Sequence, residues 1–227
     1  FKHKNIFNLM KKILFLLIAL AFSFAAPANA QQNQQLRRSR SIFLYPEFQK
    51  AKIRQSFGRF VEAEANIYLK DASLVYKENG KIMRAYTKGI FGVTFADTAE
   101  YVKVDSAMAR VVAKKGFNSL LCKTTVNMAR YREEESGGSG MDFFEMSDFN
   151  VFMNMNDDQR DDDLGIPLQD KYYFSVKGFI VPANESDFKK SMDPAKEAQF
   201  KELMKDRFWS WRDPKSLQML LDFLPEK

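Results

Sequence analysis

The stretch between residues 59 and 128 constrains the fold most, because it is a succession of strand patterns that no helix fits. Its first segment alternates Val61, Ala63, Ala65 and Ile67 with polar or mixed residues. A period of two places successive side chains on opposite faces of a strand, whereas a helix would scatter them around its axis. Each strand then has one apolar face, which predicts a sheet buried on one side.

Turn signals separate these strand segments. Asn79-Gly80 supplies the positive φ angles of a two-residue type I′ hairpin, with Glu78 and Lys81 flanking the turn. The gaps are too short for the crossover helices that parallel strands need. The spacing predicts an α+β fold, mostly an antiparallel meander or sandwich of about 8–10 strands. The β-rich domain is expected over residues 42–182, with a loop and short-helix insertion at residues 132–168 and a last strand near residues 170–181.

Residues 183–227 carry helix signals, and we expect a helical pair packed on the sheet within the same domain. Asp193-Pro194 and Asp213-Pro214 each combine an N-cap residue with proline at the first helical position. A helical stripe of leucines follows the second signal, at Leu217, Leu220, Leu221 and Leu224.

The N-terminal 30 residues resemble a secretory signal peptide. Met10-Lys11-Lys12 precedes an apolar run from residue 13 to about residue 24, and Ala28-Asn29-Ala30 matches a cleavage site. We expect residues 1–9 to lie upstream of the natural start, cleavage after Ala30, a flexible lead-in at residues 31–41, and a periplasmic or secreted protein without a transmembrane span. The alternative is an uncleaved membrane anchor.

Composition excludes several chemistries from the processed chain. Signal removal takes four of the 35 basic side chains and none of the 29 acids, so the remainder is nearly neutral and is not predicted to bind nucleic acid. The one histidine, His3, leaves with the signal, which excludes Ser-His-Asp catalysis and His-containing zinc sites. Cys122 has no disulfide partner in the chain and is expected to be buried and inert. No cofactor or metal is predicted.

Two aromatic groups are candidate ligand-binding residues. A Phe- and Met-rich segment at residues 141–155, next to a Gly-rich stretch, suits a lid over an apolar ligand, with Phe144, Phe149 and Phe152 as its contacts; the alternative, which we favour, is that it fills the end of the core. Trp209 and Trp211 suit stacking on a sugar or a lipid interface, and the alternative, which we favour, is packing between two helices.

Acidic side chains offer two further hypotheses. The acids of residues 157–163 do not have calcium-loop spacing, so a solvated loop is favoured over a calcium site. Glu62 and Glu64 share a strand face, and a glycan hydrolase would need two such carboxylates facing each other across a groove.

The segment from Gly58 to Val126 resembles a loose group of exported proteins of unknown function from Bacteroidetes-type bacteria. The resemblance covers about a third of the chain and implies export and a β-rich shape, without functional residues. It is carried by Ala63-x-Ala65-Asn66-x-Tyr68, Ser73-Leu74-Val75-Tyr76, Phe91-x-Val93-x-Phe95 and Tyr101-x-Lys103-Val104-Asp105.

The leading hypothesis is an exported, non-catalytic cell-envelope protein that binds or scaffolds an unknown envelope component. One alternative is a carrier of a lipid or other apolar ligand, and another is a carboxylate-dependent glycan hydrolase. The hypothesis of a non-catalytic role depends on the missing histidine and on the lack of a nucleophile motif.

Overall fold

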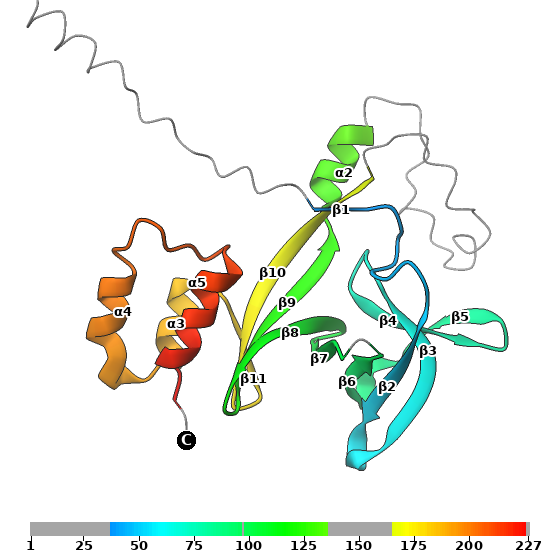
Figure 1. Ribbon diagram of the computed structural model, residues 1–227, viewed down its shortest axis with the longest axis horizontal. Helices are drawn as coiled ribbons and strands as arrows, with labels where there is room; N and C mark the ends of the chain where they lie inside the picture. Colours follow the sequence, from blue (N-terminus) through cyan, green and yellow to red (C-terminus); the bar gives the residue numbers. More distant parts are fainter. Residues whose placement is uncertain (1–36, 97, 136–164, 226–227) are drawn as a thin grey trace, which may run out of the picture. The chain divides into compact units, whose positions relative to one another are not determined.

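The computed structural model describes residues 37–96, 98–135 and 165–225. Within these ranges the chain forms an eleven-stranded antiparallel sheet in the order β1-β10-β9-β8-β7-β6-β2-β3-β4-β5, with β11 paired to β10 (Figure 1). Helices lie mainly in the C-terminal part. The predicted α+β class with a mostly antiparallel sheet is therefore confirmed.

The strands lie close to the positions that the sequence predicts, but burial in β3 does not follow the predicted alternation, because Val61 is 44% exposed. Their bounds are β1 Arg38–Ser39, β2 Gln49–Gln55, β3 Phe60–Tyr68, β4 Ser73–Glu78, β5 Lys81–Arg84, β6 Ile90–Phe95, β7 Glu100–Val104, β8 Ala107–Lys115, β9 Asn118–Val126, β10 Ile166–Val176 and β11 Phe179–Pro182. Two short 3₁₀ turns join strands, η1 Ser56–Gly58 and η2 Thr87–Gly89. The strands from β2 to β9, in chain order, thus correspond to the strand patterns in the sequence.

The β4–β5 hairpin forms as its turn sequence predicts. Asn79 and Gly80 have φ angles of 50° and 74°, which are the positive values of a type I′ turn. Glu78 lies directly opposite Lys81 in the antiparallel register. The turn therefore sets the register of the whole hairpin.

The sheet curls so that the β3–β4 connection reaches the far strands. The Met108 amide donates a 2.8 Å hydrogen bond to the Ala72 carbonyl, and the Val126 amide donates one of 2.8 Å to Leu69. The buried side chains enclosed by this curl include Ile53, Ala65, Ile67, Leu74, Val93, Phe95, Tyr101 and Met108. Apolar burial of this kind is the main contribution to folding stability.

The segment before β2 runs along the edge of β3, where Phe43 and Tyr68 form an isolated antiparallel bridge. The Leu44 amide donates a backbone hydrogen bond to the Ile67 carbonyl, and the Leu69 amide donates one to the Ile42 carbonyl. The buried side chain of Asn66 donates from Nδ2 to the Tyr45 carbonyl at 2.8 Å. Asn66 and Tyr68 are buried here, although in the sequence they alternate with the apolar side chains of β3. The end of β3 is thus buried on both faces.

Residues 170–181 were predicted to form one strand, and the structure corrects this to a hairpin. Lys177 and Gly178, with φ angles of 51° and 91°, make a two-residue turn between β10 and β11. Arg38 and Ser39, predicted within a flexible lead-in, instead pair with the start of β10 as strand β1.

The C-terminal helices pack as one cluster against β9 and β10. They are α3 Glu185–Ser191, η4 Pro194–Lys196, α4 Glu197–Leu203, α5 Pro214–Met219 and η5 Leu220–Phe223. Asp193 and Asp213 cap their helices as predicted, accepting from the Ala195 and Ser216 amides at 3.0 and 2.8 Å. Helix α3, capped by Asn184, was not predicted. Within the described ranges, no helix combines the length and apolar character that crossing a membrane requires.

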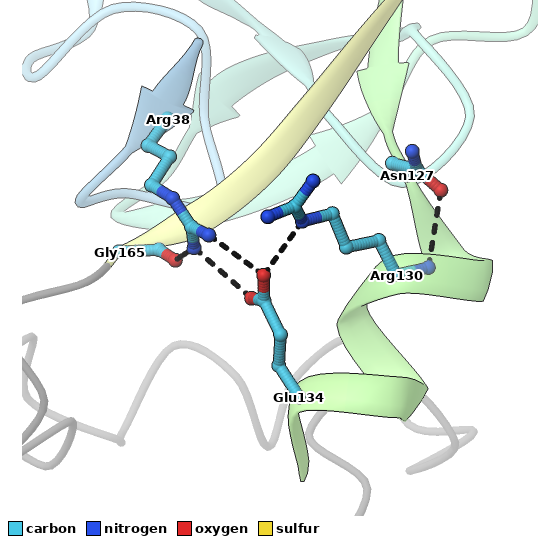
Figure 2. A network of polar contacts seen from close by, with 5 residues as sticks. All are labelled: Arg38, Asn127, Arg130, Glu134 and Gly165. Atoms are coloured by element: carbon cyan, nitrogen blue, oxygen red, sulfur yellow. Dashed lines mark hydrogen bonds and ion pairs between the residues drawn. The ribbon is translucent and has the colours of Figure 1, made fainter. Parts of the chain in front are cut away.

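A short helix, α2 (Met128–Glu135), follows β9 and is fixed to the sheet by charge. Figure 2 shows Glu134 accepting hydrogen bonds from the Arg38 guanidinium at 2.6 and 3.0 Å and from Arg130 Nε at 2.8 Å. Arg38 also donates to the Gly165 carbonyl at 2.8 Å. The Arg38 hydrogen bond, followed by that from Arg130, lowers the pKa of Glu134 to about 2. Arg38 therefore links α2, β1 and the residue that precedes β10.

Candidate functional site

A cavity of about 320 Å³ opens at the concave side of the sheet. Its walls come from β3, β7, β8, β9 and β10, together with the segment before β2, the start of α5 and Arg37. The lining residues are Arg37, Leu44, Tyr45, Ile67, Tyr101, Met108, Arg110, Val112, Cys122, Thr124, Asp170, Tyr172 and Pro214. The volume is at the lower end of the range typical of small-molecule sites.

Strand register places four of these lining residues in one row across the sheet. Tyr172 lies opposite Cys122, Cys122 opposite Arg110, and Arg110 opposite Tyr101. Directly opposed residues of antiparallel strands have Cβ atoms about 4.5–5.5 Å apart on the same face. The row therefore presents two phenols, a thiol and a guanidinium to the same space.

A second row, next to the first, holds a compact ion pair. Asp170 lies opposite Thr124; the Thr124 hydroxyl donates a 2.6 Å hydrogen bond to Asp170 Oδ1, and Arg37 Nη1 donates one of 2.6 Å to Oδ2. The carboxylate of Asp170 is thus bound by two donors on different elements. Arg37 and Asp170 neutralise each other, so they add no net charge to the cavity.

Arg110 supplies the unbalanced charge of the cavity. Its side chain is exposed at the mouth, beside the 40% exposed Val112. Arg110 has no ion pair or side-chain hydrogen bond with any other residue in the described ranges. A guanidinium carries five donors and is suited to carboxylate or phosphate groups. The mouth is therefore positively charged and rich in hydrogen-bond donors.

The thiol of Cys122 is protonated at neutral pH. Burial, followed by the nearby Asp170 carboxylate, raises its pKa to about 12. Its sulfur lies 3.9 Å from the Thr124 hydroxyl. Burial also raises the pKa of Tyr172, with a further contribution from Cys122. Because the thiolate is the nucleophilic form, Cys122 contributes a weak hydrogen-bonding and apolar surface.

The deep wall is formed by buried apolar side chains and by two tyrosine rings. Ile67 and Met108 are each 1% exposed, and the Tyr101 hydroxyl lies 3.1 Å from that of Tyr45, which closes the wall from the segment before β2. Tyr45 packs on Phe95 at a centroid distance of 4.9 Å, and Phe95 packs edge-on against Tyr101. The cavity thus combines an apolar floor with a polar mouth.

Trp209 and Trp211 lie apart from this cavity, in the helical cluster. Their ring centroids are 4.7 Å apart at 79°, and Trp211 lies 6.1 Å from Phe188. Both side chains are half-buried, and the buried Trp209 Nε1 has no hydrogen-bond partner in the described ranges. The pair packs between helices, which is the arrangement that the sequence favoured, and the cavity lining contains neither ring.

The remaining predicted sites lie elsewhere. Phe144, Phe149 and Phe152, and the acidic residues 157–163, fall outside the described residues. Glu62 and Glu64 are exposed on β3, away from the cavity lining. Among described residues, no group of three or more His, Cys, Asp or Glu side chains is arranged to hold a metal ion.

Sequence reasoning missed the cavity residues because they come from five strands, two connecting segments and the start of α5. Arg37 and Asp170 are separated by 133 positions, and Arg110 meets Cys122 only through strand register. The one usable signal was the parity that placed Cys122 and Thr124 on the same face.

Comparisons with protein families, curated proteins and solved structures found no match to this chain. The resemblance to exported Bacteroidetes-type proteins therefore stays a prediction.

Proposed function

We propose that this chain is a non-catalytic binding protein that holds a small amphipathic anion in the cavity between β3 and β10. The observation that carries the proposal is the position of Arg110, at the mouth of a cavity whose floor is apolar. A ligand with one carboxylate or phosphate and a short apolar body would satisfy both. The proposal follows the hypothesis of a carrier for an apolar ligand, but it assigns the ligand to this cavity and not to the Phe-rich segment.

The chemistry of the lining supports binding over turnover. The raised pKa of Cys122 leaves a neutral thiol, and Asp170 is already bound by Arg37 and Thr124. Glycan hydrolysis by the usual route needs two carboxylates flanking the scissile bond. Among the described residues that line the cavity, Asp170 is the single carboxylate, which favours the carrier over the hydrolase.

Export to the periplasm or beyond is part of the proposal, and its support is the N-terminal sequence. A binding role in the cell envelope fits a chain that is nearly neutral after signal removal and whose cavity takes a compact ligand. Whether the chain scaffolds an envelope component is a separate hypothesis, which the cavity does not require.

Native mass spectrometry with decanoate tests the proposal. Decanoate has one carboxylate and a short chain, so we expect a one-to-one adduct with the purified chain. Val112→Trp, which places an indole at the mouth, should abolish the adduct. Val61→Trp is the matched control, because Val61 is also exposed, at 44%, and does not line the cavity. Failure of the wild-type chain to form the adduct, or equal adducts in both variants, would overturn the proposal.

A further inference from the structure

Two turns meet at one end of the sheet, away from the cavity lining. Turn η1 joins β2 to β3 (blue to cyan in Figure 1), and η2 leads into β6. Gln55 pairs with Ile90 across β2 and β6, and a Cβ added to Gly89 would lie 3.8 Å from Ser56 Oγ. We name the exposed aromatic residues on and beside these turns the aromatic tip: Phe57, Phe60, Tyr86 and Phe91.

The aromatic tip leaves large apolar surfaces in water. Phe57 is 93% exposed, Tyr86 79%, Phe60 53% and Phe91 52%. Phe57 also has a φ angle of 60°, a left-handed conformation that is costly for a bulky side chain. Within the described residues, no packing contact of the Phe57 side chain offsets its exposure or its strained backbone. Exposed apolar patches of this kind mark surfaces that meet another phase or partner.

Cations surround the aromatic tip, and none has an ion pair within the described ranges. Lys103 Nζ bonds the Thr87 carbonyl at 3.0 Å, which holds its charge beside η2. The nearest carboxylate by strand register is Glu62, opposite Lys52. The five cations are Lys52, Arg54, Arg59, Lys88 and Lys103. These five positive charges, of which only that of Lys52 has a carboxylate directly opposite it in the strand register, make the tip complementary to an anionic surface.

The arrangement of lysines over the rings distinguishes a membrane from a nucleic acid. Lys52 Nζ lies 4.6 Å from the Phe60 ring centroid, and Lys103 Nζ lies 6.0 Å from that of Phe91. Stacking of a nucleic-acid base needs a free ring face, and at Phe60 and Phe91 an ammonium group already covers one of the two faces. At a lipid interface the same pairing is favourable, because the ring enters the acyl boundary while the lysine reaches the headgroups.

We propose that the aromatic tip docks the protein on an anionic membrane surface, with Phe57 entering the interface and the surrounding lysines and arginines contacting lipid headgroups. The occupant is a phospholipid bilayer with negative headgroups. This site is independent of the cavity, and neither proposal requires the other. Basic residues near an anionic surface are attracted to it, and salt screens this attraction.

A fluorophore at residue 57 tests the docking in the full chain. Phe57→Cys is labelled with a nitrobenzoxadiazole dye, and Phe179→Cys is the matched control, because Phe179 is 77% exposed on β11. Cys122 is buried and should take up no label, which the unsubstituted chain verifies. With vesicles of phosphatidylglycerol and phosphatidylcholine, we expect a blue shift at position 57 and none at position 179. Each label reports the environment at its own position, so a membrane contact made by the N-terminal segment would not produce a shift at position 57 alone.

The charge requirement gives the second arm of the test. In the labelled Phe57→Cys chain, the double substitution Arg59→Gln and Lys88→Gln should lower the affinity for anionic vesicles, measured by the blue shift, at least tenfold. Salt at 0.5 M should lower the affinity by a similar factor. Pure phosphatidylcholine vesicles should give no shift. No shift at position 57 with anionic vesicles, or an equal shift at position 179, overturns the proposal. A shift with single-stranded oligo-dT in place of vesicles also overturns it, in favour of a nucleic-acid partner.

Discussion

Gly92 lies so close to strand β7 that a Cβ added to it would be 2.5 Å from the Tyr101 carbonyl oxygen. Gly92 pairs with Val102 across β6 and β7, and Tyr101 lines the cavity. The spacing of these strands behind the cavity floor therefore depends on the missing side chain at position 92.

Gly92→Ala should destabilise the protein by about 1–3 kcal/mol, because either β7 must move or the backbone of β6 must distort. Urea unfolding measures the loss. Gly89→Ala is the control, since its Cβ would meet Ser56 Oγ at an ordinary 3.8 Å. Equal stability of the two variants would show that β6 and β7 are not packed as described.

Asn66→Leu should cost about 2–4 kcal/mol of unfolding free energy. The Asn66 Oδ1 accepts from the Tyr45 and Ile67 amides at 3.1 and 2.8 Å, and its Nδ2 donates to the Tyr45 carbonyl. Leucine leaves these buried groups unpaired, at about 1–3 kcal/mol each before relaxation. Glu64→Leu, at an exposed position of the same strand, should change stability little in the same denaturation experiment. A near-neutral Asn66→Leu would contradict the role of this amide in fixing the segment before β2.

Glu134 should stabilise the fold above its unfolded pKa and lose that contribution in acid. Its folded pKa of about 2 lies below the ordinary 4.5, so the stabilisation is complete above about pH 4.5 and declines as pH falls toward 2. The side chain is 22% exposed, so we expect a contribution of about 1–2 kcal/mol after screening.

The measurement compares wild type with Glu134→Gln by urea unfolding at pH 7 and pH 3.5. The stability difference should shrink at the lower pH. Glu202→Gln is the control, because the Glu202–Lys205 pair is largely exposed, at 72% and 70%. A difference that does not change with pH would mean that Glu134 acts by packing and not by charge.

Cys122 should resist thiol reagents in the folded protein. With a pKa of about 12, less than about one thiol in a thousand is ionised at pH 8, so modification by a disulfide reagent should be far slower than in urea. The raised pKa also means that stability falls as pH rises above the unfolded thiol value of about 8.5. Rapid modification of the native chain at pH 8 would contradict the buried position.

The fold was predictable because alternation and turn chemistry act locally. The β4–β5 hairpin follows from Asn79-Gly80, and the caps at Asp193 and Asp213 formed where the sequence places them. The β10–β11 hairpin was missed, although Lys177-Gly178 has the same Lys-Gly sequence as Lys115-Gly116 in the turn between β8 and β9. Helix α2 was missed because its residues are mostly charged and have no apolar stripe.

The cavity was not predictable because it depends on register and on long-range contacts. Parity puts Cys122 and Thr124 on one face, but it cannot show that Arg110 lies opposite Cys122. That pairing is adjacent to an irregularity between Val111 and Ala113, which shifts the register of β8 by one residue. A one-residue shift changes which side chains share a face, so sequence alone leaves the row undetermined.

The central claim is that Arg110 selects an anionic ligand in the cavity. Calorimetric titration with decanoate and with decanol, which has the same chain without the charge, tests it most directly. Arg110→Gln should weaken decanoate binding at least tenfold and leave decanol binding unchanged, because a charged hydrogen bond contributes about 1.5–3 kcal/mol. Arg54→Gln, an exposed arginine outside the cavity lining, should change neither. Equal affinity of wild type and Arg110→Gln for decanoate would contradict the account.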